Sequence, residues 1–156
     1  MFALRLVQLI EHNADKLAEG LIQRLKHSNS CNELLACVPA HELKHRALEI
    51  YGNLTDWMLN KTKAEVEERY IGIGALRAHQ GVPFSQFLYA IHATKENLWD
   101  FMQQEGLLEP GDLISQMELL RAMEHFFDRA LYFASIGHEG VMQNEFTRSQ
   151  VAVHTA

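Results

Sequence analysis

The segment His41-Glu42-Leu43-Lys44-His45 matches the His-Glu-x-x-His pattern of zinc hydrolases. On a helix, this spacing places two imidazoles on one face, where they can hold Zn²⁺ beside a glutamate that acts as a general base. A pattern this short can also arise by chance on an amphipathic helix, and the chain has nine histidines. The surrounding residues must therefore decide between a zinc site and a solvated helix face.

The positions of these residues on a helical wheel argue against a zinc site. At about 100° per residue, His41 and His45 fall opposite the apolar stripe, and Glu42 falls on the polar flank, where it can pair with Arg46. A catalytic zinc site also needs a third protein ligand and a sheltered cleft. Glu65 is the ligand that the sequence offers, but it lies across a predicted turn between helices. We therefore expect no metal at His41, Glu42 and His45, and keep a zinc hydrolase as a remote alternative.

The segment Gly72-Ile73-Gly74 begins like a glycine-rich nucleotide loop. Such a loop needs a preceding strand and a third glycine, and the sequence shows neither. Small residues inside a helix can instead let another backbone approach closely. We expect Gly72 and Gly74 to serve this packing role.

Length and charge indicate one domain that binds neither nucleic acid nor membranes. The 156 residues suit a single domain. The formal net charge is −6, and Lys and Arg form no dense cluster, which argues against a nucleic-acid surface or a polybasic membrane anchor. No segment is long and apolar enough to span a membrane, and the start lacks the features of a signal peptide. Because Cys31 and Cys37 fit no metal or redox motif, we expect a cytoplasmic protein with two reduced thiols.

Apolar periodicity predicts an all-α fold, a bundle of about five helices. Gly81 is placed to cap the third helix. We assign residues 1–140 to one helical sensor and dimerisation domain, and 141–156 to a flexible tail or truncated linker. The apolar stripes fit a globin-like arrangement and a simple up-down bundle equally well. The predicted helices span 3–27, 39–60, 63–80, 83–105 and 113–138, with a short helical turn in the connection 28–40.

Three charged residues interrupt the apolar stripes of three consecutive predicted helices. Arg77 falls on the inner arc with Tyr70, Lys95 lies in the next stripe, and Glu124 lies in the last one, bordered by Asp128. Because an unpaired buried charge is very costly, we predict that Arg77 or Lys95 pairs with Glu124 or Asp128. Two roles stay open. The pair is either architectural, or it forms the polar part of an internal pocket that binds a small anionic ligand.

An aromatic cluster in the last predicted helix is broader than one stripe. This width predicts that the helix is covered on two sides, by the domain's own core and by a partner chain. The candidates for a homodimer interface are Phe126, Tyr132 and Phe133.

Several motifs together resemble a known family. The central ones are Gly74 and Arg77, the turn Gln80-Gly81-Val82-Pro83, and the pair Leu98-Trp99. The segments 6–25 and 126–131 fit as first and last helices. The chain resembles the sensor-type N-terminal domain of RsbRD, the co-antagonist of the stress-response kinase RsbT, and is similar to the haem-free globin-like sensors of the RsbR group.

This resemblance implies a cytoplasmic, non-enzymatic signalling domain, usually dimeric, that regulates a downstream output module of the stress-response or histidine-kinase type. In haem-binding relatives of the wider class, a histidine on the helix before such a Gly-Val turn holds the iron. Here Arg77 takes the inward position and His79 faces away, so we expect no cofactor. The alternative is a sensor of haem, held by His92 or His79, or of another small ligand.

Overall fold

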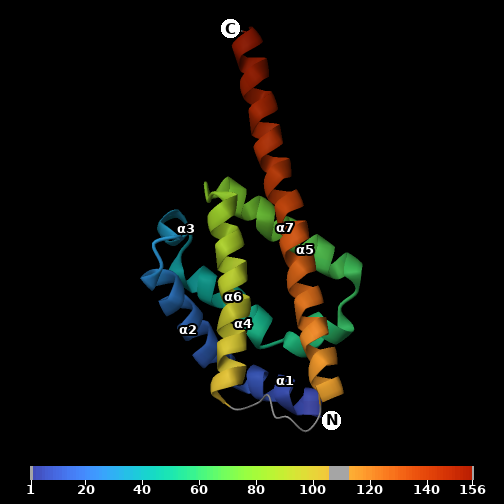
Figure 1. Cartoon of the computed structure of the whole chain (residues 1–156). Helices are drawn as coiled ribbons and strands as arrows, with labels where there is room; N and C mark the ends of the chain where they lie inside the picture. Colours follow the sequence, from blue (N-terminus) through green and yellow to red (C-terminus); the bar gives the residue numbers. More distant parts are fainter. Residues whose placement is uncertain (1, 106–112, 156) are drawn as a thin grey trace.

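All regular secondary structure is helical in the part of the chain that the computed structural model describes, residues 2–105 and 113–155. These residues contain no strand, which confirms the all-α prediction. In Figure 1, α6 and α7 run along the height of the domain, and α1 lies across one end. The helical segments are α1 (Phe2–His12), α2 (Ala14–His27), α3 (Asn32–Cys37), α4 (Ala40–Tyr51), the π-helical turn η1 (Asp56–Asn60), α5 (Lys63–His79), α6 (Phe84–Gln104) and α7 (Leu113–Thr155).

The first predicted helix, 3–27, is divided at Asn13 into α1 and α2. The Asn13 side-chain amide donates a hydrogen bond to the Leu9 carbonyl at 2.8 Å, and its backbone amide lies 3.1 Å from both Leu9 O and Ile10 O. An asparagine that bonds nearby carbonyls competes with the regular helical pattern. This local competition explains the break that apolar periodicity did not reveal.

The second predicted helix, 39–60, is also interrupted, because α4 ends at Tyr51 and the chain resumes as the short turn η1. In a continuing helix, the Glu49 carbonyl would accept the backbone amide four residues later. It accepts instead from the Asn53 side chain at 3.1 Å and from the Trp57 indole at 3.0 Å. These side chains satisfy the end of α4 and turn the chain toward α5.

Both ends of α5 follow from local sequence signals. Thr62 and Glu65 form a reciprocal capping box, with the Glu65 amide 3.2 Å from Thr62 Oγ1 and the Thr62 amide 2.7 Å from Glu65 Oε2. At the other end, Gly81 has φ 79°, and Val82 N donates to the Arg77 carbonyl at 3.0 Å. This closure requires a residue that tolerates the left-handed conformation, so the predicted cap at Gly81 is confirmed.

The last helix is much longer than predicted. The expected end at about His138 is wrong, because α7 continues without a break to Thr155 and contains 43 residues, or about 64 Å at the helical rise. The segment expected as a tail is therefore helical, and its C-terminal part projects beyond the other helices (Figure 1). None of the described helices, α7 included, combines the length and hydrophobicity that a membrane span needs.

Two glycines bring the backbones of α5 and α7 into direct contact. A methyl group built on Gly74 would lie 2.0 Å from the Ala134 carbonyl oxygen, and one built on Gly137 would lie 2.0 Å from that of Ile71. Any side chain at either position would force the helices apart. The packing role predicted for Gly74 is thus confirmed, whereas a side chain at Gly72 would meet nothing within 4 Å.

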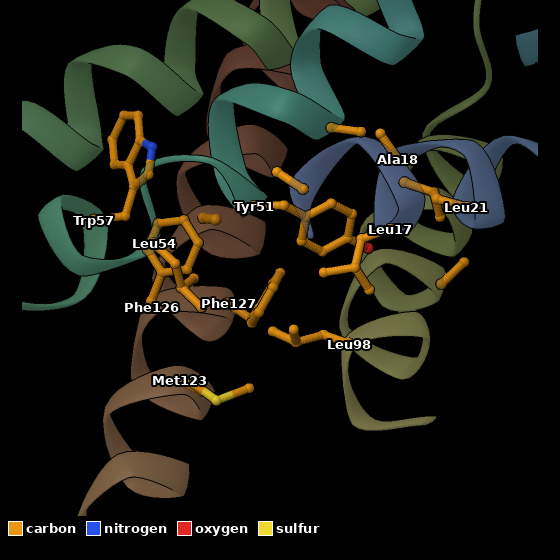
Figure 2. Close-up of a cluster of buried hydrophobic side chains, with 14 of the residues drawn as sticks. Leu17, Ala18, Leu21, Tyr51, Leu54, Trp57, Leu98, Met123, Phe126 and Phe127 are labelled. Atoms are coloured by element: carbon orange, nitrogen blue, oxygen red, sulfur yellow. The ribbon is translucent and has the colours of Figure 1, made fainter. Parts of the chain in front are cut away.

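The core takes up most of the aromatic cluster of α7. Figure 2 shows Phe126 and Phe127 among Leu54, Tyr51 and Leu98, which come from three other parts of the fold. The two remaining interface candidates differ from each other: Phe133 is buried, whereas Tyr132 is 62% exposed. The prediction that Phe126 and Phe133 face a partner chain does not fit, because their side chains are already covered within this chain.

Candidate functional site

A small cavity, partly open to solvent, lies inside the domain between α2, α4, α5 and α6, with Leu34 of α3 on one side. Its volume is about 70 Å³, roughly half that of an engineered apolar cavity that admits benzene. One part of the wall is aliphatic and aromatic, whereas α4 and α5 contribute charged and hydroxyl groups. The lining residues include Leu21, Ile22, Phe87, Arg46, Glu49, Tyr70 and Arg77.

Arg77 is the most deeply buried charge on this wall, with only 2% of its surface exposed. Its Nη1 donates to Glu42 Oε1 at 2.9 Å and to Gln80 Oε1 at 2.7 Å, and Gln80 Nε2 lies 3.3 Å from Glu42 Oε2. The hydrogen bond from Arg77 is the largest of the effects that together lower the pKa of Glu42 below its usual range. Arg77 is thus buried and paired as predicted, but its partner is Glu42 of α4 and not Glu124 or Asp128.

A second ion-pair cluster joins the same two helices. Glu49 of α4 accepts two hydrogen bonds from Arg69 of α5, from Nε at 2.8 Å and Nη2 at 2.9 Å, and a third from Arg46 Nη1 at 3.2 Å. Partial burial acts to raise the pKa of Glu49, but the hydrogen bonds and charges of Arg69 and Arg46 outweigh it and hold the pKa below its usual range. The two-pronged Arg69 contact is the geometry in which guanidinium recognises carboxylate best.

Two hydrogen-bond donors on the cavity wall have no acceptor among the described residues. The Arg46 Nε–H is buried without a partner, and the Tyr70 hydroxyl, on a residue only 4% exposed, makes no hydrogen bond within the described chain. Burial, with the nearby Glu49 charge, raises the pKa of Tyr70, so its hydroxyl keeps the proton. Buried donors in native proteins are normally satisfied, so the unpartnered Arg46 Nε–H marks the polar end of the cavity as incomplete, and the Tyr70 hydroxyl on the same wall can donate to a further acceptor.

The predicted pair between α6 and α7 exists, but it lies away from this cavity. Lys95 Nζ is 3.2 Å from Glu124 Oε2, which confirms that pairing, and Glu124 is 41% exposed. Lys95 and Asp128 instead border an outer groove of about 380 Å³ between α6 and α7. The residues predicted as one ionic site are therefore split between an internal cavity and a surface groove.

The predicted metal and haem positions show no convergence in the described residues. His41 and His45 are exposed, Glu42 is bonded to Arg77, and no group of three or more His, Cys, Asp or Glu side chains is placed to share a metal there. Among the haem candidates, His79 is exposed, and His92 is 57% exposed beside Glu96.

The sequence reading missed His138, which is 6% exposed. Its Nε2 lies 2.8 Å from the Val82 carbonyl, and its ring packs near Phe84. This contact ties α7 to the turn between α5 and α6. The sequence offered one signal, because His138 lies four residues after Ala134 and therefore on the same helix face.

Comparison with known proteins gives one match. The family model described as the RsbT co-antagonist protein rsbRD N-terminal domain matches residues 15–150, and so spans α2 to α6 and most of α7. The resemblance to the RsbRD N-terminal domain is thereby confirmed. No curated protein and no solved structure matches the chain significantly.

Proposed function

The chain belongs to the family of RsbT co-antagonist rsbRD N-terminal domains, and from this premise we propose that it is a non-enzymatic sensor and dimerisation domain in stress-response signalling. The single observation that carries the proposal is α7, one continuous helix that is packed in the core between Leu119 and His138 and exposed at its C-terminal end. Such a helix joins an internal change to whatever lies beside or beyond its C-terminal part. A downstream output module or regulatory protein is the proposed receiver.

The core half of α7 is firmly coupled to α5. Backbone contacts at Gly74 and Gly137 allow no side chain between the helices, and the Tyr70 ring packs against Phe126 with centroids 5.9 Å apart. Because Tyr70 also lines the cavity, a change in the occupancy of the cavity has a short physical route to α7. We propose that signals act by shifting the packing of α5 and α7 as a unit.

The C-terminal half of α7 carries an exposed apolar stripe. Met142, Phe146 and Val153 are 48%, 65% and 75% exposed, and their spacings of four and seven residues place them on one helix face. This is the spacing by which two helices pair in a coiled coil. We propose that the stripe pairs with the same segment of a second copy, and that Tyr132 lies near the start of this interface.

Measurement of size in solution tests this dimer. Light scattering on the whole chain at increasing concentration should give twice the monomer mass, 17.9 kDa for one chain. Phe146→Glu should shift the equilibrium to monomer, because it places like charges in the interface. Asn144→Glu adds the same charge on the opposite face and should leave the dimer intact. A strict monomer at high concentration, or equal effects of both variants, would contradict the proposed mode of dimerisation.

A further inference from the structure

We propose that the internal cavity binds a small monocarboxylate, whose oxygens accept hydrogen bonds from Arg46 and Tyr70 and whose short alkyl group lies against the aliphatic wall. The role of this ligand as a signal depends on the proposed sensory function, to which the inference adds the chemical class of the ligand. As a binding event, it depends only on the cavity and can be measured on the chain itself.

The unsatisfied donors specify an anionic oxygen ligand. Arg46 Nε and the Tyr70 hydroxyl both belong to residues that line the cavity, and each offers one proton that no described group accepts. The nearest carboxylate, Glu49, already accepts three hydrogen bonds from Arg46 and Arg69. An incoming carboxylate has two oxygens with several lone pairs, and so can satisfy both donors at once.

The charge of the wall favours an anion over a neutral ligand. Three guanidinium groups, Arg46, Arg69 and Arg77, are bound to only two carboxylates, Glu42 and Glu49. The cluster therefore holds one formal positive charge in excess. Within this cluster, Arg46 lies in a partly buried environment. An extra anion inside would balance the cluster, whereas a cation would add repulsion in a medium of low dielectric constant.

Size and wall chemistry limit the rest of the ligand. A volume of about 70 Å³ holds only a few heavy atoms, so an aromatic ring or a nucleotide would extend out of the cavity. Opposite the charged wall lie apolar side chains from α2 and α6, including Leu21, Ile22 and Phe87, which favour a short alkyl group over a second polar one. The class that fits is a carboxylate with about two to four carbons.

Binding should be measured by calorimetry with sodium formate, acetate, propionate and butyrate, at constant ionic strength with chloride as the balancing anion. For a ligand of so few atoms, we expect Kd values on the order of 0.1–10 mM. Affinity should rise about fourfold for each CH₂ added until the cavity is full. Propanamide, which has the same shape without the charge, should bind at least about tenfold more weakly than propionate.

Variants separate the proposed site from general ion effects. Tyr70→Phe removes one hydroxyl and should weaken propionate binding about tenfold, and Arg46→Lys, which keeps the charge but lacks the Nε–H, should act in the same direction. Ala90→Leu fills part of the cavity and should abolish binding. Tyr89→Phe, which removes a hydroxyl at the outer groove and away from the cavity, is the matched control and should bind as the unmodified chain does.

Clear results would overturn the inference. These are the absence of saturable binding up to about 100 mM, far above the expected range, equal affinity for propanamide and propionate, or full affinity in both Tyr70→Phe and Ala90→Leu. The first result would mean that ordered water alone satisfies the two donors. Circular dichroism melting confirms that each variant is folded. The dimer measurement does not involve the cavity, so a failure here leaves that test of the proposed function unaffected.

Discussion

The two sides of α5 are built in opposite ways. Toward α4, it reaches across with the long side chains of Arg69 and Arg77, which bind Glu49 and Glu42 beside a cavity. Toward α7, it presents no side chain at Gly74 and forms the most extensive helix–helix contact of the described residues. Long side chains can exchange partners and rotamers, whereas backbone contacts have no such freedom. In the proposed function, the side toward α4 responds to a ligand, and the side toward α7 transmits the movement.

The charged side should show the largest effect on stability. Glu42→Ala leaves the Arg77 guanidinium buried without its carboxylate, which should lower the free energy of unfolding by about 3–5 kcal/mol. Urea unfolding followed by circular dichroism measures this loss. Glu42→Gln retains a hydrogen-bond acceptor and should cost less than Glu42→Ala. If the two variants are equally stable, the Arg77 charge is satisfied in another way.

The glycine side should give the next largest effect. Gly137→Ala puts a methyl group within 2.0 Å of the Ile71 carbonyl, and the forced separation of α5 and α7 should cost about 2–3 kcal/mol. Gly72→Ala is the matched control, because it adds the same methyl group to α5 in open space. The control should stabilise the helix by about 0.5–1 kcal/mol. Equal effects of the two substitutions in urea unfolding would remove the distinction between the two sides of α5.

Of the two sides of α5, only the side that faces α4, with its ion pairs, should contribute less to stability at acid pH. Because Arg77 lowers the pKa of Glu42 in the folded chain below its ordinary value of 4.5, the unfolded chain binds this proton more readily. The resulting stability is present above about pH 4.5 and is lost as the pH falls through the folded pKa. The stability difference between the unmodified chain and Glu42→Gln should therefore shrink between pH 5 and pH 3. Gly137→Ala should instead retain its deficit relative to the unmodified chain over this range.

The ion pair between Lys95 of α6 and Glu124 of α7 should have the smallest effect on the free energy of unfolding. Lys95 and Glu124 are 21% and 41% exposed, and water already solvates much of both groups. Lys95→Gln should therefore change the free energy of unfolding by no more than about 0.5 kcal/mol. A loss near that of Glu42→Ala would show that the groove between α6 and α7 is as important for stability as the cavity wall.

The sequence predicted the features that depend on neighbouring residues and on helix faces. Gly81 and Pro83 marked the α5–α6 turn correctly, and the wheel placed Arg77 inside and His41 outside. Breaks that depend on side chain to backbone bonds, such as the one at Asn13, leave the apolar period unchanged and were missed. The extension of α7 was also missed, because its apolar residues are exposed and do not pack against the core of the domain.

The candidate site was predictable only in part, because helix register is a tertiary property. The wheel identified Arg77 as buried, but it placed Glu42 on the polar flank of its helix and therefore favoured Glu124 or Asp128 over Glu42 as the partner of Arg77. The choice between them depends on how far α4 and α5 slide past each other, and on the unexpected end of α4 at Tyr51. Arg69 and Glu49 were not considered as a site, because each lies on the flank of its own helix.

The length of α7 has a mechanical consequence. The helix extends 17 residues past His138, its last anchoring side chain on the domain body, which is about 26 Å at the helical rise. A rigid rod held at that point amplifies small angles, and a tilt of only about 5° would carry the far end through about 2 Å. An adjustment of this kind at the base, too slight to disturb the core, would be enough to change how two such rods meet.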